Sequence, residues 1–182
     1  MANRLLPINR NITFICWIGN MEYAKGKKTP QDSEWQAVYT VREEDLNVWN
    51  QLFGGRLMEW IDKAAGIAAS QHCDGLVVTA AVNDLHFISG AALGDRIELH
   101  SKVTYVGRTS LEVRVDVYKT DPQTGMTEKI NQAYVTEVYT DSMRRPRPVA
   151  WGLDPVSDEE KKEYQNALKR IDNRKMRQKE GF

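Results

Sequence analysis

The sequence predicts an α+β fold in which an antiparallel sheet wraps around one long central helix. From the Gly54-Gly55 pair to about residue 72, the chain has few β-branched residues, many alanines and a helical apolar period. After a turn signal at Asp74-Gly75 the period changes to two, which is typical of strands. Because a nearly all-apolar helix needs cover, a sheet that curls around it is the natural solution.

The central helix has one apolar side and a narrow polar stripe, if successive residues turn by ~100°. The apolar side consists of Leu57, Trp60, Ile61, Ala64 and Ala68, and the stripe of Arg56, Glu59 and Lys63. Asp62 lies off this stripe, on a face whose other members are small or apolar: Gly55, Met58, Ala65, Gly66 and Ala69. An ionisable group therefore points where another backbone or a ligand can come close.

Five strands are expected around this helix. They cover residues 35–41, 76–88, 96–106, 111–120 and 129–140. The near-continuous apolar first half of the second strand predicts burial on both of its faces. A tight connection at Gly107-Arg108-Thr109 joins the third strand to the fourth, and residues 89–95 and 121–127 form loops.

The chain divides into three segments. Residues 1–33 form an extension and linker, residues 34–142 the domain, and residues 143–182 a Pro/Arg-rich stretch followed by a charged helix from 158 to about 177. Ser157 and Glu160 form a capping box at the start of that helix, which either docks on a neighbour or is solvated. Residues 1–20 only weakly imitate a secretory signal, so we read them as an upstream extension before Met21 or as a segment that packs on a partner.

Composition excludes several functional classes. The 25 acidic and 25 basic residues balance among 182, so no overall field attracts nucleic acid or an anionic membrane. No stretch reaches the ~18 apolar residues of a membrane span. Two cysteines, Cys16 and Cys73, favour a reducing cytoplasm, and the three histidines have no metal-ligand spacing.

Several motifs together resemble the hotdog-fold acyl-CoA thioesterases, in the branch that holds the bacterial YciA-type enzymes and the animal brain-type acyl-CoA hydrolase. The resemblance covers roughly residues 35–140. It is carried by Asn47, the run Phe53-Gly54-Gly55-Arg56-Leu57-Met58, Trp60, Asp62, Val78-Thr79-Ala80, His86-Phe87, Gly94-Asp95 and Val106-Gly107-Arg108-Thr109-Ser110. Two positions depart from the family pattern. Asn50 stands where the family usually has glycine, and Ser89-Gly90-Ala91-Ala92 replaces a loop that usually contains proline.

The resemblance implies a single hotdog fold that hydrolyses acyl-CoA thioesters, with catalysis by Asn47 and Asp62. It also implies that these two residues come from different subunits. We therefore expect a homodimer as the minimum unit and a hexamer built as a trimer of dimers. No separate cofactor is expected, because coenzyme A is part of the substrate and product. The predicted location is the cytoplasm.

The residue types suit this chemistry. Asp62 can act as general base or attack the carbonyl itself, and the sequence does not choose between these roles. Asn47 carries both a donor and an acceptor, so it can orient water or the carbonyl, although a turn-forming asparagine is the alternative. The free backbone N–H groups at Gly54 or Gly55 can stabilise the oxyanion; otherwise the glycines only shape the start of the helix.

Coenzyme A is expected at the turn Gly107-Arg108-Thr109-Ser110, which offers backbone donors, a guanidinium and two hydroxyls. An ordinary hairpin turn is the alternative for the same residues. Thr79 either lines the pantetheine tunnel or fills the core. No metal-binding residues are predicted.

Three other functions compete with the thioesterase. A non-catalytic module that binds acyl-CoA or fatty acid would keep the fold and lose the chemistry, and Asn50 is its only hint. A hotdog dehydratase would need a catalytic histidine, and none stands at position 47 or 62. An interaction protein would use residues 143–182 to bind a partner or nucleic acid, which zero net charge disfavours.

Overall fold

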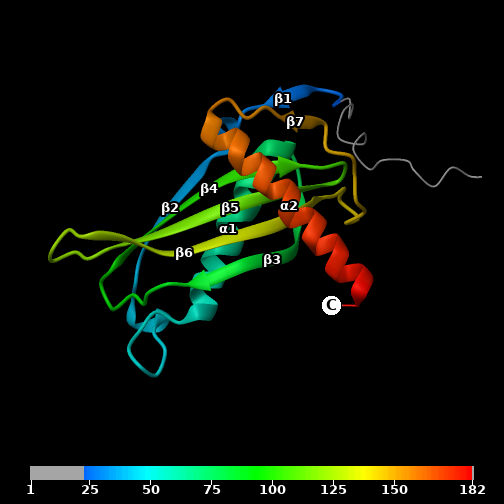
Figure 1. Ribbon diagram of the computed structural model, residues 1–182. Coiled ribbons are helices and arrows are strands. Elements are labelled where there is room, and N and C mark those ends of the chain that lie inside the picture. Colours follow the sequence, from blue (N-terminus) through cyan, green and yellow to red (C-terminus); the bar gives the residue numbers. More distant parts are fainter. Residues whose placement is uncertain (1–22, 182) are drawn as a thin grey trace, which may run out of the picture.

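The computed structural model describes residues 23–181 and shows a five-stranded antiparallel sheet between two α-helices (Figure 1). The strand order is β2-β4-β5-β6-β3, and a small second sheet pairs β1 with β7. The strands are β1 (Gly26–Lys28), β2 (Trp35–Thr40), β3 (Val77–Phe87), β4 (Arg96–Val106), β5 (Ser110–Thr120), β6 (Thr127–Tyr139) and β7 (Trp151–Leu153). The helices are α1 (Gly54–Cys73) and α2 (Asp158–Glu180), and two 3₁₀ turns, η1 (Pro30–Ser33) and η2 (Glu43–Asp45), flank β2. The predicted α+β hotdog architecture is confirmed.

The core lies between α1 and the concave face of the sheet. All five residues of the predicted apolar side of α1 are buried, and they belong to one cluster with valines, leucines and isoleucines of β4, β5 and β6. The ring of Trp60 also stacks on Tyr39 of β2, with 4.5 Å between centroids. On the polar stripe, Glu59 accepts from Arg56 at 2.6 Å and from Lys63 at 2.5 Å. The helical period therefore predicted correctly which side of α1 is covered.

The expected burial of the second predicted strand on both faces is wrong. Among the strands of residues 23–181, this strand, β3, lies at the edge of the sheet and pairs only with β6. Val78 and Val82 are 39% and 45% exposed. An edge strand has no further strand beside it. Within this single chain, the apolar residues of β3 therefore stay partly exposed.

The predicted linker and the Pro/Arg-rich segment contain regular structure that the sequence did not indicate. Gly26–Lys28 pairs in parallel with Trp151–Leu153. The imidazole of His72, at the end of α1, lies 3.3 Å from the Ser33 hydroxyl and 3.3 Å from the Trp151 carbonyl. Strands of three residues are too short to show a period of two, which is why both were missed. The expectation for residues 1–20 lies outside the described residues.

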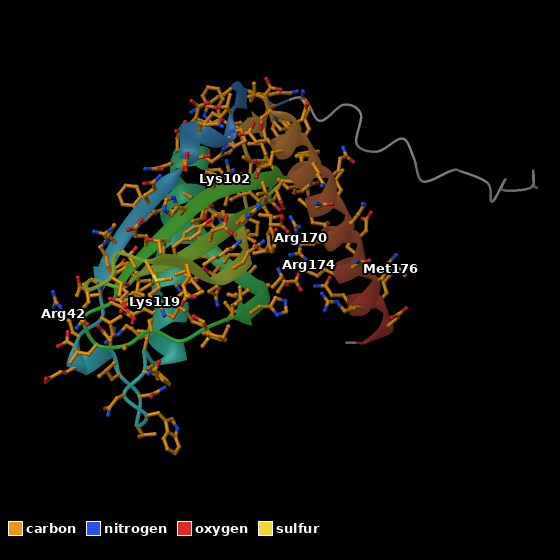
Figure 2. All side chains as sticks on the ribbon, turned by 60° about the vertical axis from the view of Figure 1, so that its left-hand side comes forward. Arg42, Lys102, Lys119, Arg170, Arg174 and Met176 are labelled. Carbon is orange, nitrogen blue, oxygen red and sulfur yellow. The ribbon has the colours of Figure 1, made fainter. Side chains whose placement is uncertain are left out.

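The C-terminal helix α2 docks on the outer face of its own sheet. The predicted capping box is confirmed: Glu160 N donates to Ser157 Oγ at 3.2 Å, and Ser157 N donates to Glu160 Oε2 at 2.9 Å. Figure 2 shows Arg170 and Arg174 directed from α2 toward the sheet, whereas Met176 points away from it. The interpretation of a solvated helix is therefore wrong. Neither helix within residues 23–181 is long and apolar enough to cross a membrane.

Ion pairs join α2 to the sheet, and the one between Arg170 and Glu112 contains the more deeply buried carboxylate. Arg170 donates from Nε and Nη2 to the two carboxylate oxygens of Glu112, at 3.2 and 2.8 Å, and its guanidinium lies 3.6 Å from the centre of the Tyr134 ring. The Glu112 side chain is only 5% exposed. A carboxylate buried to this degree needs its partner, because an uncompensated buried charge is costly.

Replacing Arg170 by alanine is expected to lower the free energy of unfolding by about 3 kcal/mol, because Glu112 then stays buried without its cation. Arg177→Ala, at an exposed position of the same helix, is the matched control and should change stability by less than about 0.5 kcal/mol. Urea unfolding followed by circular dichroism measures both. Equal effects of the two substitutions would show that the pair does not anchor α2.

Candidate active site

Asp62 lies on an open face of α1. Next to it, the Met58 side chain is 44% exposed, and a methyl group added at Gly66 would meet no atom within 4 Å. Ala65 and Ala69, farther round the same face, are fully buried. The Asp62 carboxylate is itself exposed in the single chain and accepts a hydrogen bond from the Thr79 hydroxyl of β3, at 2.7 Å. The part of this face that Met58, Asp62 and Gly66 form is therefore free to receive a ligand or another chain.

The Thr79 hydroxyl also contacts a second carboxyl group, that of Glu137. Thr79 and Glu137 are opposite each other in the β3–β6 ladder, and Thr79 Oγ1 lies 3.1 Å from Glu137 Oε1. Glu137 has no exposed surface. Burial, with a further contribution from the charge of Asp62, raises the pKa of Glu137 to about 7, and a hydrogen bond from Thr79 to this carboxyl acts in the opposite direction. Asp62, Thr79 and Glu137 thus form one connected group, which we call the helix-face half-site.

Sequence reasoning missed Glu137. The signal was present, because residues two and four positions earlier on β6, Val135 and Ala133, face the core at the strand period. A glutamate continuing such a series is directed into the core, where an ionisable group is rarely found without a specific role.

Asn47 belongs to a tight loop between η2 and α1. Its side-chain oxygen accepts hydrogen bonds from the backbone N–H groups of Trp49 and Gln51, at 2.8 and 3.2 Å. The loop is held to the helix by an ion pair of 2.9 Å between Arg56 and the buried Asp45. Asn47 is therefore a turn-forming asparagine, and its amide nitrogen remains as the group that can donate to a substrate.

Asn50, which stands where the resembling family usually has glycine, adopts a left-handed conformation with φ of 55°. Asparagine tolerates this region better than other residues that carry a Cβ atom. The loop therefore retains the backbone geometry that a glycine would allow, and the departure from the family pattern leaves the position of Asn47 intact.

Gly54 and Gly55 begin α1 and leave two donors available. Phe53 at the N-cap contributes no side-chain hydrogen bond, and neither glycine N–H donates to any residue that the structure describes. A Cβ atom at Gly55 would collide with the Phe53 ring, and one at Gly54 would lie 3.3 Å from Phe87. The two N–H groups at the positive end of the helix dipole are thus suited to an oxyanion.

The structure does not bring all predicted catalytic residues together within one chain. Asp62 lies eight positions after Gly54 along α1, which corresponds to roughly 12 Å of helix. Asn47, Gly54 and Gly55, which we call the loop half-site, therefore lie well apart from the helix-face half-site. The loop half-site offers hydrogen-bond donors and no carboxylate, whereas the helix-face half-site offers the carboxyl groups of Asp62 and Glu137.

The turn predicted to bind coenzyme A lies close to the helix-face half-site. Gly107 N donates to Ser110 O at 2.7 Å and closes the hairpin between β4 and β5. Leu111, the next residue, is opposite Glu137 on β6, which is opposite Thr79 on β3. Two strand spacings, roughly 10 Å, thus separate the start of β5 from Thr79.

A groove of about 230 Å³ opens beside this turn. Arg108, Thr109 and Ser110 line it together with Arg174 and Lys175 of α2. The two cations of α2 were missed by sequence reasoning, because nothing in a solvated-looking charged helix indicates which of its residues face the turn. The groove gathers three cationic side chains and four residues that carry hydroxyls, and its one carboxylate, Glu112, is paired with Arg170, so the composition is suited to phosphate groups.

The fold and these half-sites define a hotdog-fold protein of the thioesterase class. The thioesterase superfamily matches residues 50–126 of the chain. An uncharacterized acyl-CoA thioester hydrolase of Bacillus subtilis, YkhA, is 38% identical over 133 residues, which cover 73% of this chain and 77% of that protein. The chain therefore belongs to the acyl-CoA thioester hydrolase family of the thioesterase superfamily.

Solved structures agree with this assignment. The crystal structure of an apo-hexameric acyl-CoA thioesterase has a TM-score of 0.80 and 34% identity, covering 84% of this chain and 97% of that one. An acyl-CoA hydrolase from Staphylococcus aureus, in complex with butyryl coenzyme A and coenzyme A, has a TM-score of 0.78 and 32% identity, covering 85% and 93%. Structures of the S. aureus enzyme also include alanine variants of one asparagine, one aspartate and one threonine.

Asn50→Ala is expected to destabilise the protein by about 1–2 kcal/mol, because alanine has no compensating hydrogen bond in the left-handed region. Asn50→Gly, which adopts this conformation freely, should keep the wild-type stability. Urea midpoints of the two variants measure the difference. Equal midpoints for the alanine and glycine variants would contradict a requirement for the left-handed conformation at this position.

Proposed function

We propose that this protein hydrolyses acyl-CoA to a free fatty acid and coenzyme A, at sites where the loop half-site of one chain meets the helix-face half-site of another. The observation that carries the proposal is the Asp62 carboxylate on the open face of α1, fixed by Thr79 and exposed to an incoming chain and ligand. Membership of the acyl-CoA thioester hydrolase family supports the same reaction.

In this proposal Asp62 is the general base. The Thr79 hydroxyl stabilises one oxygen of the charged carboxylate, and the other oxygen removes a proton from water as the water attacks the thioester carbonyl. Asn47 orients the carbonyl through its amide nitrogen. The N–H groups of Gly54 and Gly55 stabilise the oxyanion, and the thiolate of coenzyme A leaves with the proton held by Asp62.

The variants made in the S. aureus enzyme support these roles. The altered asparagine, aspartate and threonine of that enzyme are separated by 15 and 17 residues. The same intervals separate Asn47, Asp62 and Thr79 in this chain. An agreement of residue type and spacing at three positions favours equivalent places in a shared site.

Exposed apolar side chains on β3 and α1 support a dimer. The outer edge of β3 has no partner strand within residues 23–181. Val78 and Val82 on β3, with Met58 and Ile67 on α1, expose between 38% and 45% of their surface. Exposed apolar side chains beside an open strand edge are typical of an interface between chains. The hexameric relative supports a further assembly as a trimer of dimers.

We place the nucleotide of coenzyme A in the groove beside the β4–β5 turn, where Arg108, Arg174 and Lys175 offer cations to its phosphates. From there the pantetheine arm extends past Thr79 toward Asp62. The reaction as proposed uses no separate cofactor and no metal, since protein groups supply the base and the oxyanion donors. The buried free thiol of Cys73 fits the reducing cytoplasm in which we expect the protein to act.

Asp62→Asn is expected to lower kcat for thioester hydrolysis by roughly a hundredfold or more, because asparagine cannot accept the proton from water. Free-thiol release from acetyl-, hexanoyl- and palmitoyl-CoA measures the effect and ranks the substrates. Lys63→Gln, at the neighbouring exposed position, is the matched control and should retain activity. Binding of coenzyme A without turnover by the wild type would instead establish the non-catalytic binding module.

Mixing two inactive variants tests the shared site. Asn47→Ala and Asp62→Ala chains, unfolded together and refolded in equal amounts, should recover about a quarter of the wild-type activity. Half of the dimers are then mixed, and each mixed dimer has one intact site of two. Each variant refolded alone is the control. A mixture as inactive as its components, with dimers confirmed by light scattering, would place the complete site within one chain.

A further inference from the structure

Glu137 is a buried acid directly behind the proposed general base. Its side chain has no exposed surface, and Oε1 lies 3.1 Å from Thr79 Oγ1. Its other oxygen, Oε2, has no hydrogen-bond partner among the residues that the structure describes. Thr79 Oγ1 in turn lies 2.7 Å from Asp62 Oδ1. Two carboxyl groups therefore share one hydroxyl, one from the open face of α1 and one from the core.

A threonine hydroxyl has a single proton to donate. The shorter contact assigns this proton to Asp62. The contact with Glu137 is then favourable only if Glu137 carries a proton and donates it to a lone pair of Thr79. Two ionised carboxylates would leave one contact between lone pairs, on the Glu137 side of Thr79, where the carboxyl group has no exposed surface. One proton on Glu137 satisfies both contacts at once.

We propose that Glu137 is a positioning residue for the reaction: its protonated carboxyl donates to Thr79, and Thr79 consequently donates to Asp62 and holds that carboxylate ionised and fixed. This inference rests on the proposed function of Asp62. The proton of Glu137 stays in place during turnover, so the hydrolysis gains and loses no proton through it. The orientation of the base then depends on the protonation state of a residue that never touches the substrate.

The surroundings of Glu137 leave Asp62 as the charged group that faces it. From α1 its charge interacts with Asp62 and with the Cys73 thiol, and burial raises the pKa of that thiol to about 12, so that it stays neutral. From β5 the opposite residue is Leu111, and from β3 it is Thr79. Along β6 the same-face neighbours are Val135 and Tyr139. No cation among these groups favours the ionised form, consistent with the pKa of Glu137 at about 7.

The decisive measurement compares kcat across pH for the wild type, Glu137→Gln and Glu137→Leu. Ionisation of Glu137 removes the donor to Thr79, so the wild type should lose roughly tenfold in kcat between about pH 6 and about pH 9. Glutamine donates to Thr79 at every pH, so this variant should match the wild type at pH 6 and keep its activity at pH 9. Leucine has no donor and should be roughly tenfold slower throughout.

Glu128→Gln makes the same substitution on an exposed glutamate of the same strand, and it should leave the pH profile unchanged. If the leucine variant fails to fold, the glutamine variant alone decides. A glutamine profile that falls with pH as the wild type does would overturn the proposal. A purely structural role for Glu137 would alter stability and leave the shape of the profile as it is.

A second measurement needs no activity. Infrared spectra recorded across pH should show a carboxyl C=O band that titrates near pH 7 in the wild type and is absent from Glu137→Gln. The unfolding free energy of the wild type, relative to this variant, should fall as pH rises from about 4.5 to about 7, because the folded state holds its proton longer than the unfolded chain. A wild type that hydrolyses no thioester would contradict the proposed function. A wild-type spectrum without the titrating band would contradict the protonation of Glu137.

Discussion

The structure depends on burying one side of α1 against the sheet. Trp60, Ile61 and Ala64 leave water only if β4, β5 and β6 curve around the helix, and this contact is the main hydrophobic term available to a sheet of five strands. Because the helix turns by 100° per residue, fixing that side also fixes where Asp62 emerges. The packing of α1 against the sheet sets the rotation of the helix about its axis. This rotation brings the Asp62 carboxylate to Thr79 on the edge strand.

The second layer is held in a different way. The outer face of the sheet bears Glu112, and α2 covers it through Arg170 and the Tyr134 ring. An ion pair in this position is directional, whereas the apolar core is not, so it selects how α2 lies across the strands. The same orientation brings Arg174 and Lys175 into the groove that Arg108 also lines. The contacts that dock α2 on the sheet, which also include Arg114 with Glu163 and Arg174 with Thr136, therefore place the cations of the groove as well.

Most of the fold could be predicted because its signals are local. The period of 3.6 in α1, the alternation of β4 to β6 and the capping box at Ser157 each lie within one segment of sequence. The edge position of β3 and the pairing of β1 with β7 could not be predicted, since strand order depends on contacts between distant segments. The apolar run in β3 predicted burial on both faces, but Val78 and Val82 are partly exposed in the single chain because β3 lies at the edge of the sheet.

The candidate site divides in the same way. Asn47, Asp62 and Gly54-Gly55 could be proposed from short motifs, whereas Glu137 and Arg174 act through neighbours more than thirty residues away in the sequence. Within the helix-face half-site, the Thr79 hydroxyl can donate one hydrogen bond, and Asp62 accepts at 2.7 Å. Glu137 Oε2 has no hydrogen-bond partner among the described residues. A base on an exposed helix would otherwise be free to rotate. In the mechanism proposed above, coupling Asp62 through the Thr79 hydroxyl to Glu137 in the core would give the exposed carboxylate the fixed orientation that general-base catalysis requires.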